Sequence, residues 1–277
     1  MNFENIHIYN FENALRGMRN PKNSWDKSDS KFGFDSFKNF TDRVDDMISL
    51  YRKDELKAGI NEEIYHQWLQ DYAGDVGINF DEKSEIFEYA IIGPNDMKLA
   101  KTLIKGGPEH RKFLRQIFVS VDITAPLYWW KEADTYKTGT VSNSTSTMHK
   151  LTSKPITLDC FEIDDYNSEV MNEIETELNG ASVKIIIDIC ESLRKKYIET
   201  KDKRYWKELV RWLPESWLQT RTITLNYENI LSICHQRENH KLNEWSGKDY
   251  PELSNFIEFA RSLPYASDFI FWNGLEN

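Results

Sequence analysis

The sequence predicts a protein of mixed α and β structure, because two hydrophobic periods alternate along the chain. Apolar residues recur every three or four positions over 34–54, as they do on one face of a helix. Over 113–124 the second half, IFVSVDIT, alternates apolar and polar residues, as a half-buried strand does. The 277 residues contain no internal repeat, no low-complexity tract and no dividing linker, so we expect a single domain over 1–277.

Further elements follow from the same periods and from the residues that start or stop them. Strands are expected over 3–10, 86–92 and 217–225. Helices are expected over 61–71, 168–200, 202–213, 226–245 and 251–262, and over a segment that ends at 104 and has Asn95 or Asp96 as its N-cap. Pro94 and Pro214 interrupt regular structure, because proline lacks a backbone N–H.

The composition is that of an ordinary globular chain with an acidic surface. Hydrophobic residues make up 40% of the sequence, and the formal net charge is −10. A surface of that sign disfavours binding to nucleic acid and anionic membranes, and no run of 18 apolar residues exists to span a bilayer. Three widely spaced cysteines and an N-terminus without a basic or apolar leader lead us to expect a cytoplasmic protein.

Several common catalytic patterns are absent from the sequence. It contains no G-x-G-x-x-G, G-x-x-x-x-G-K-[ST], H-E-x-x-H or G-x-S-x-G motif. The six histidines show no spacing suited to a metal, so no metal site is expected. No pair of carboxylates stands out as an acid–base couple. Candidate functional residues are therefore sought in two stretches of unusual composition.

The first stretch is APLYWWKEADTYKTGTVSNSTSTMH, at 125–149. Pro126 suits the first turn of a helix, so the aromatic block is expected to be helical to about Lys137. A run of hydroxyl and amide residues, 138–147, then follows. Two interpretations remain open. The aromatic helix and donor-rich loop hold a flat ligand with a phosphate tail, or a buried helix is followed by a solvated loop.

The second stretch surrounds the helix expected over 226–245. Asn226 and Arg237 are 11 residues apart, and 11 helical steps of about 100° place both side chains on one face. His240 lies one turn further along. That face either contacts a heterocycle or a phosphate, or it is a surface face whose charged side chains pair locally.

Together the two stretches resemble the flavin-dependent thymidylate synthases. In that family a Leu-Pro is followed by Thr-x-Asn, and the Asn starts a helix that carries an Arg 11 residues on and a His a few residues later. This chain has Leu213-Pro214, then Thr224-Leu225-Asn226, then Arg237 and His240. Arg211 lies close to the place of an Arg that commonly precedes the Leu-Pro of the family.

The family signature, R-H-R-x-x-S-x-N-x-x-S-x-R, follows an Ala-Pro-like helix start. Laid on Ala125-Pro126 without gaps, the signature falls on 135–147. Residues with hydrogen-bonding side chains then take the places of the third motif residue, the first Ser, the Asn and the second Ser: Lys137, Thr140, Ser142 and Thr145. A one-residue slip would bring Asn143 and Ser146 into place instead. The first Arg, the His and the last Arg have no match.

The resemblance implies an α/β (α+β) fold, in which a mixed or antiparallel sheet is flanked by helices, and assembly into a homotetramer. It implies methylation of dUMP to dTMP, with FAD taking hydride from NADPH and methylenetetrahydrofolate supplying the one-carbon unit, or a closely related modification of a pyrimidine nucleotide. The catalytic residue would be Arg237, which grips the pyrimidine and stabilises negative charge on its ring. The implied binding residues are Arg211, Lys137, Thr145, Ser146 and Arg237 for the small-molecule nucleotide, and Tyr136, Lys137, Thr140, Asn143, Asn226 and His240 for the cofactor.

The departures from the family pattern keep two other functions open. Replacing a phosphate-binding Arg by Thr removes a charge-assisted hydrogen bond worth about 1.5–3 kcal/mol. Lys137, His149 or the basic cluster within 16–22 could offset that loss. Otherwise the chain is a catalytically inactive nucleotide-binding protein on the same fold, or a structural protein on an old enzyme fold.

Overall fold

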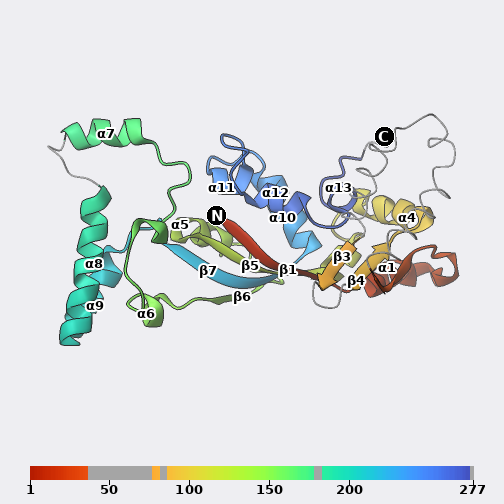
Figure 1. The fold of residues 1–277 in the computed structure, drawn as a ribbon. Helices are drawn as coiled ribbons and strands as arrows, with labels where there is room; N and C mark the ends of the chain where they lie inside the picture. The colour runs from red at the N-terminus through yellow and green to blue at the C-terminus, as the bar shows by residue number, and fades with distance from the viewer. Residues whose placement is uncertain (37–76, 82–85, 178–182, 275–277) are drawn as a thin grey trace. The chain divides into compact units, whose positions relative to one another are not determined.

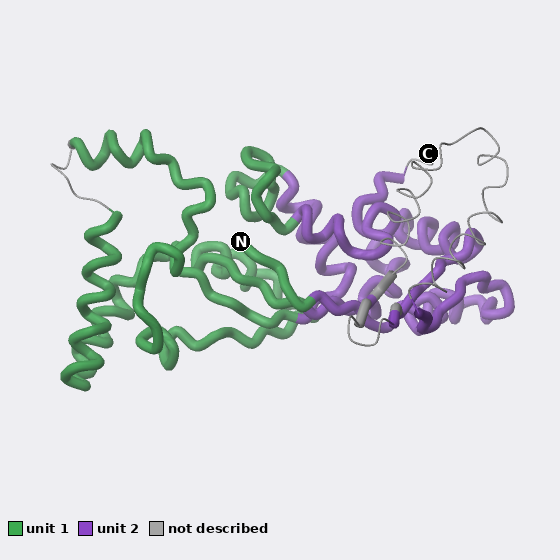
Figure 2. Tube along the Cα trace, viewed as in Figure 1, with its two compact units in different colours: residues 1–5, 121–223, 239–256 green, residues 6–120, 224–238, 257–277 purple. Residues whose placement is uncertain are grey.

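The computed structural model describes residues 1–36, 77–81, 86–177 and 183–274. Its contacts divide the chain into two compact units (Figure 2). Unit 1 comprises Met1–Asn5, Val121–Ile223 and Asn239–Phe256, and unit 2 comprises Ile6–Ser120, Thr224–Glu238 and Ile257–Asn277. The predicted single domain stays a prediction. The predicted helix over 61–71 and most of the one over 34–54 lie outside the described residues.

A four-stranded sheet has the order β1-β5-β7-β6 (Figure 1). Its strands are β1 (Asn2–Tyr9), β5 (Phe118–Pro126), β7 (Leu218–Asn226) and β6 (Val141–Ser144). The first three confirm the strands expected from the alternating segments. In β5 every second residue from Val119 to Ala125 is buried, so the period of two seen in the sequence marks the face that packs on the core.

A second sheet, of three strands, belongs to unit 2 and has the order β2-β4-β3. Its strands are β2 (Lys31–Ser36), β4 (Ile86–Ile91) and β3 (Gly77–Asp81), and both pairs are antiparallel. Strand β4 confirms the prediction for 86–92. The expected helix start at Phe34 is wrong, because residues 34–36 end β2 and pair with Glu88, Phe87 and Ile86.

The remaining elements of unit 2 are helices, several of which carry the rings of one aromatic cluster. They are α1 (Phe11–Arg19), η1 (Asn20–Lys22), η2 (Trp25–Lys27), α4 (Pro94–Lys105), η4 (Lys112–Gln116), α10 (Tyr227–Arg237) and α13 (Ala266–Phe269), together with most of α12 (Phe256–Arg261). Phe11 lies 5.6 Å from Tyr227 and 6.0 Å from Tyr265, between ring centroids. Phe269 contacts the rings of Phe11 and Phe113. This cluster fixes the N-terminal part of α10, because Tyr227 is its first residue.

The prediction that Asn95 or Asp96 is the N-cap of α4 is wrong. The helix begins at Pro94 with Gly93 as its N-cap, and Asp96 is buried. Its carboxylate accepts hydrogen bonds from Arg19, Ser28 and Ser30. Burial alone would raise the pKa of Asp96, but these hydrogen bonds outweigh it and lower that pKa. Arg19 is therefore part of a buried ion pair and does not compensate for a missing phosphate contact.

Most helices of unit 1 lie between β5 and β7 in the sequence. They are α5 (Leu127–Ala133), α6 (Thr147–Lys150), η5 (Leu158–Cys160), α7 (Ser168–Glu177), α8 (Val183–Thr200) and α9 (Lys203–Trp212); α11 (Asn243–Ser246) follows later. The predictions for 168–200 and 202–213 are confirmed over the described residues. One core cluster of this unit joins α8 and α9 through Cys190 and Leu209. No helix in the described part of the chain is long and apolar enough to cross a membrane.

Helix α5 is shorter than predicted. The backbone N–H groups of Leu127 and Tyr128 donate to carbonyls of the segment before β7, at Trp217 and Glu215, which fixes where the helix starts. It ends at Ala133 instead of near Lys137. The hydroxyl run that follows is not a plain loop, since it contains β6 and the start of α6.

Helix α10 also ends early, at Arg237, whereas the sequence predicted helix to Trp245. The predicted N-cap is confirmed. The Asn226 side chain accepts a hydrogen bond from Asn229 N, and the Asn229 side chain accepts one from Asn226 N. The chain then turns, because the Asn243 side chain hydrogen-bonds both backbone groups of Tyr250. Helix α12 is likewise shorter than the expected 251–262, and α13, which was not predicted, follows it.

We predict that Asn226→Ala lowers the stability of the folded chain by about 1 kcal/mol, the usual cost of losing an N-cap. Asn226→Ser keeps an acceptor and should lose much less. The melting temperatures of the two variants measured side by side check this. Equal melting temperatures for the wild type and Asn226→Ala would contradict the cap's role.

Candidate functional site

The aromatic block of α5 forms the core of unit 1. Trp129 and Trp130 are each 1% exposed. Trp129 stacks on Trp245 at 4.4 Å between ring centroids and meets Trp130 edge-on at 4.8 Å. Phe256 packs against Trp129 and Trp245. The block is therefore the buried aromatic helix that the sequence left open as one alternative.

Two predicted cofactor-binding residues meet at the edge of this cluster. The rings of Tyr136 and His240 both contact Trp245, at centroid distances of 6.2 and 6.5 Å. Glu132 contacts both Trp245 and His240. Its Oε2 accepts a hydrogen bond from Trp245 Nε1 at 3.0 Å and is 3.4 Å from His240 Nε2. The structure thus assembles Glu132, Tyr136, His240 and Trp245 into one group, which we call the Trp245 cluster.

Sequence reasoning missed Glu132 and Trp245. A signal for Glu132 was present, because it precedes Tyr136 by four residues, the spacing that places side chains on one side of a helix. Nothing in the sequence indicated Trp245, because Trp245 and His240 are five residues apart and would point in different directions on the helix predicted from Asn226.

The orientation of His240 follows from its hydrogen bonds. Its Nδ1 accepts a hydrogen bond from Leu242 N at 3.2 Å, so the proton of the neutral ring lies on Nε2. That N–H faces Glu132. In this arrangement neither ring nitrogen has a free lone pair. His240 can donate a hydrogen bond, but it has no nitrogen available as a general base. It also lies beyond α10, so the prediction that it shares a helical face with Asn226 and Arg237 is wrong.

The phenol of Tyr128, in the first turn of α5, lies between two carboxylates. The Tyr128 hydroxyl lies 3.2 Å from Glu162 Oε2 and is also hydrogen-bonded to Glu244. Burial, followed by these carboxylates, raises the pKa of Tyr128. Burial also raises the pKa of Glu162, and the nearby charges of Glu244 and Asp164 add to that effect. A phenol has one proton, so it can donate to only one carboxylate at a time.

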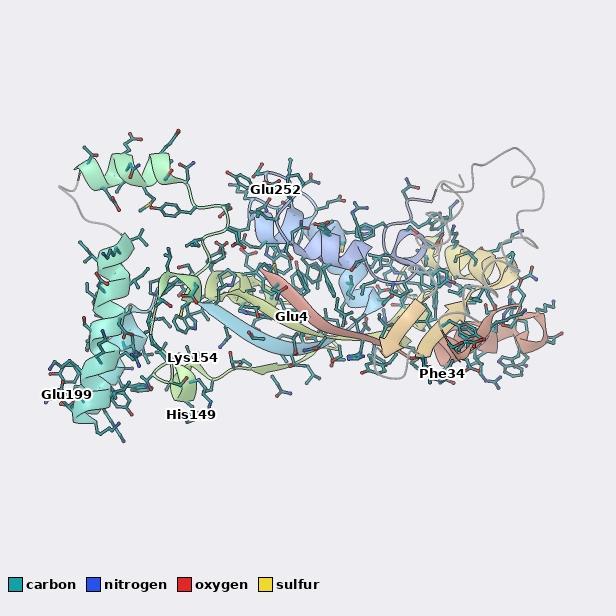
Figure 3. The ribbon with its side chains drawn as sticks, viewed as in Figure 1. Glu4, Phe34, His149, Lys154, Glu199 and Glu252 are labelled. Carbon is teal, nitrogen blue, oxygen red and sulfur yellow. The ribbon has the colours of Figure 1, made fainter. Side chains whose placement is uncertain are left out.

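The hydroxyl run presents its side chains in different ways. All four residues of β6, including Asn143, are exposed, and so is Lys137. Thr140 Oγ1 donates to the carbonyl of Tyr136, and Ser146 Oγ accepts from His149 N and caps α6. His149 lies on α6, and its side chain is drawn in Figure 3.

Thr145 is held to the sheet by its backbone. Its N–H donates to Thr220 O at 2.8 Å, while the residue as a whole is exposed. Thr145 therefore combines a fixed main chain with an accessible position, as a residue that contacts a ligand through its hydroxyl requires.

The predicted arginines have separate surroundings. Arg211, in the last turn of α9 in unit 1, pairs with Glu208 at 2.6 Å and is exposed. Arg237 is the last residue of α10, in unit 2, and is half-buried. In the same unit, Asn226 uses its side-chain oxygen for the helix cap. The structure thus brings together Tyr136 and His240, and it describes Arg237 and Asn226 as the two ends of one helix.

Metal-binding groups do not gather in the described residues. No three or more His, Cys, Asp or Glu side chains in that part of the chain are arranged to hold a metal ion.

Comparison with known proteins gives structural likenesses without a sequence match. No protein-family model matches the chain, and no curated protein matches it. A structure of the flavin-dependent thymidylate synthase ThyX from Helicobacter pylori, complexed with FAD and dUMP, is 15% identical, with a TM-score of 0.44, and covers 66% of this chain and 85% of that chain. A second structure of ThyX from the same organism, with FAD and dUMP, is 13% identical, with a TM-score of 0.44, and covers 90% and 100%. Likenesses at this level do not establish membership of a family.

We predict that Glu162 makes the stability of the chain depend on pH. Because its folded pKa is raised, its protonated form stabilises the fold. That contribution is complete below the unfolded pKa, about 4.3, and is lost as pH rises through the folded pKa. Glu162→Gln should therefore lose less stability than the wild type between pH 5 and pH 8. Denaturant unfolding at both pH values measures the difference.

The control for this experiment is Glu169→Gln, which removes one carboxylate from an exposed position in the first turn of α7. It should follow the wild-type pH dependence. If Glu162→Gln and Glu169→Gln behave alike, the raised pKa of Glu162 does not affect stability.

Proposed function

We propose that this chain is a flavin-dependent enzyme acting on a pyrimidine nucleotide: it methylates dUMP to dTMP with methylenetetrahydrofolate and NADPH, or performs a closely related modification. The observation that carries the proposal is the placement of Asn226 and Arg237. Leu213-Pro214 follows the end of α9, Thr224-Leu225-Asn226 ends β7 and supplies the N-cap of α10, and Arg237 is the last residue of α10. A chance match in sequence would not be expected to fall on such element boundaries.

Arg237 is the residue to which we assign the catalytic role. Its guanidinium is permanently charged and presents several donors in one plane, which suits a pyrimidine carbonyl on which negative charge develops. The position is half-buried, and burial strengthens such an interaction by excluding water. The alternative to a catalytic role is a structural one, in which Arg237 stabilises the C-terminal end of α10 through the helix dipole.

The donor set of the hydroxyl run fits a phosphate-bearing cofactor such as FAD. Lys137 supplies a cation, the exposed Asn143 supplies an amide, and the half-buried Thr140 supplies a hydroxyl group. Bound FAD would supply the hydride transfer of the reaction. Tyr136 offers an aromatic face, and the Nε2–H of His240, which faces Glu132, would have to exchange that contact for one with the ligand; these are the contacts that we propose for the cofactor.

The substrate contacts that we propose come from Arg211, Lys137, Thr145, Ser146 and Arg237. To bind a phosphate, Arg211 must break its ion pair with Glu208. Ser146 Oγ can donate its proton to a ligand while it continues to accept the capping hydrogen bond from His149 N. We also propose a homotetramer and a cytoplasmic location, in line with the family that the chain resembles.

A second function, nucleotide binding without catalysis, is favoured by a specific observation. The signature segment 135–147 lacks the arginines of the family, and Arg211, one of the proposed substrate contacts, is already paired with Glu208. The visible absorption spectrum of the purified protein separates the two functions, since bound flavin absorbs near 450 nm and the polypeptide does not. A colourless protein that shows no heat of FAD binding would overturn the flavoenzyme, and dUMP-dependent NADPH oxidation would overturn the inactive alternative.

We predict that Arg237→Ala weakens dUMP binding at least about tenfold, because losing a hydrogen bond to a charged group costs about 1.5–3 kcal/mol. Titration calorimetry measures the affinity, and circular dichroism checks that the helices remain. Arg204→Ala, which removes an exposed arginine at the start of α9, is the charge-matched control and should bind dUMP as the wild type does. Unchanged affinity in Arg237→Ala would refute the assignment.

A further inference from the structure

Two side chains of β7, Gln219 and Arg221, fix the hydroxyl run to the sheet of unit 1. Gln219 is 7% exposed. Its Nε2 donates to the carbonyl of Thr145 at 3.0 Å and to Thr147 Oγ1 at 3.3 Å. Because Thr145 N also donates to Thr220 O at 2.8 Å, both backbone groups of Thr145 are tied to β7. The tie lies just beyond the end of β6 at Ser144.

Arg221 decides which way the Gln219 amide points. Its Nε donates to Gln219 Oε1 at 2.9 Å. With its oxygen taken by the guanidinium, the amide must present its NH2 group to Thr145. The opposite orientation would place the amide oxygen against the carbonyl oxygen of Thr145 and an NH2 group against a cation. Leaving the hydrogen-bonding groups of a buried amide unsatisfied raises the free energy of the fold.

The guanidinium of Arg221 is itself held from two further directions. It lies over the ring of Trp130, 4.2 Å from the centroid, and its Nη1 donates to Asp134 Oδ1 at 2.8 Å. Trp130 Nε1 in turn donates to the carbonyl of Gln219 at 2.9 Å. A lysine could satisfy one of these contacts but not all three, since it lacks the planar fork of donors.

We infer that Arg221 is a positioning residue that, acting through Gln219, holds Thr145, Ser146 and Thr147 in place to contact a phosphate group of the nucleotide or cofactor. The inference rests on the proposed function only for the identity of that ligand. The positioning itself involves residues of one unit and does not require a ligand to be bound. Neither residue belongs to the family pattern that the sequence resembles.

The test compares Arg221→Gln, Arg221→Lys and Gln219→Glu with the wild type. Gln219→Glu keeps a partner for Arg221 but places a carboxylate oxygen against the carbonyl of Thr145. Hydrogen exchange of the peptide amides over 140–150 is measured without ligand, and dUMP affinity is measured by calorimetry. We expect exchange at Thr145 about tenfold faster in all three variants, since local opening becomes easier, and dUMP binding about tenfold weaker.

Arg204→Gln, which makes the same change of charge at a residue that is 91% exposed, is the control and should change neither quantity. Unchanged exchange over 140–150 in Arg221→Gln and Gln219→Glu would overturn the positioning role. Faster exchange with unchanged dUMP affinity would overturn the link to the ligand. Faster exchange in a protein whose wild type binds no dUMP would support the positioning role and count against the proposed function alone.

Discussion

The stacking of Trp129 on Trp245 is the contact on which unit 1 depends. Such pairs contribute about 0.5–1.5 kcal/mol beyond the area that they bury. Trp129 Nε1 is buried without a hydrogen-bond partner in the described part of the chain. To bring Trp245 into the core, the chain leaves the helical path after Arg237 and forms a separate short helix, α11. The same core sets the position of α5, whose other tryptophan supports Arg221.

The polar atoms around this core are mainly acidic. Glu132 accepts a hydrogen bond from an indole, and Tyr128 lies between Glu162 and Glu244. Carboxylates in such numbers repel a phosphate, in a chain whose formal net charge is already −10. A phosphate-bearing ligand is therefore better served by the hydroxyl run, with Lys137, than by the acidic side of α5. Unit 1 thus contains an acidic group around Tyr128 and a donor-rich segment over 137–147.

The same residues carry structural and proposed functional roles, and the two roles compete. Asn226 caps α10 with its side-chain oxygen, which leaves only its NH2 group for a ligand. His240 is fixed as a donor by Leu242 N and Glu132. Ser146 caps α6. These hydrogen bonds determine the orientations of the three side chains in the fold.

The sequence by itself determined β1, β4, β5 and β7 and the starts of α7, α9 and α10, since hydrophobic period and capping chemistry are local properties; it did not indicate β2, β3 or β6. It placed β1, β5 and the N-cap at Asn226 correctly, and it identified the separation of Asn226 and Arg237 that spans α10. Only the tertiary structure decided where α5 and α10 end, because burial of Trp245 outweighs local helix preference. It also decided that Glu132 meets His240 and that Arg221 orients Gln219, because contacts between residues far apart in the chain leave no periodic signal in the sequence.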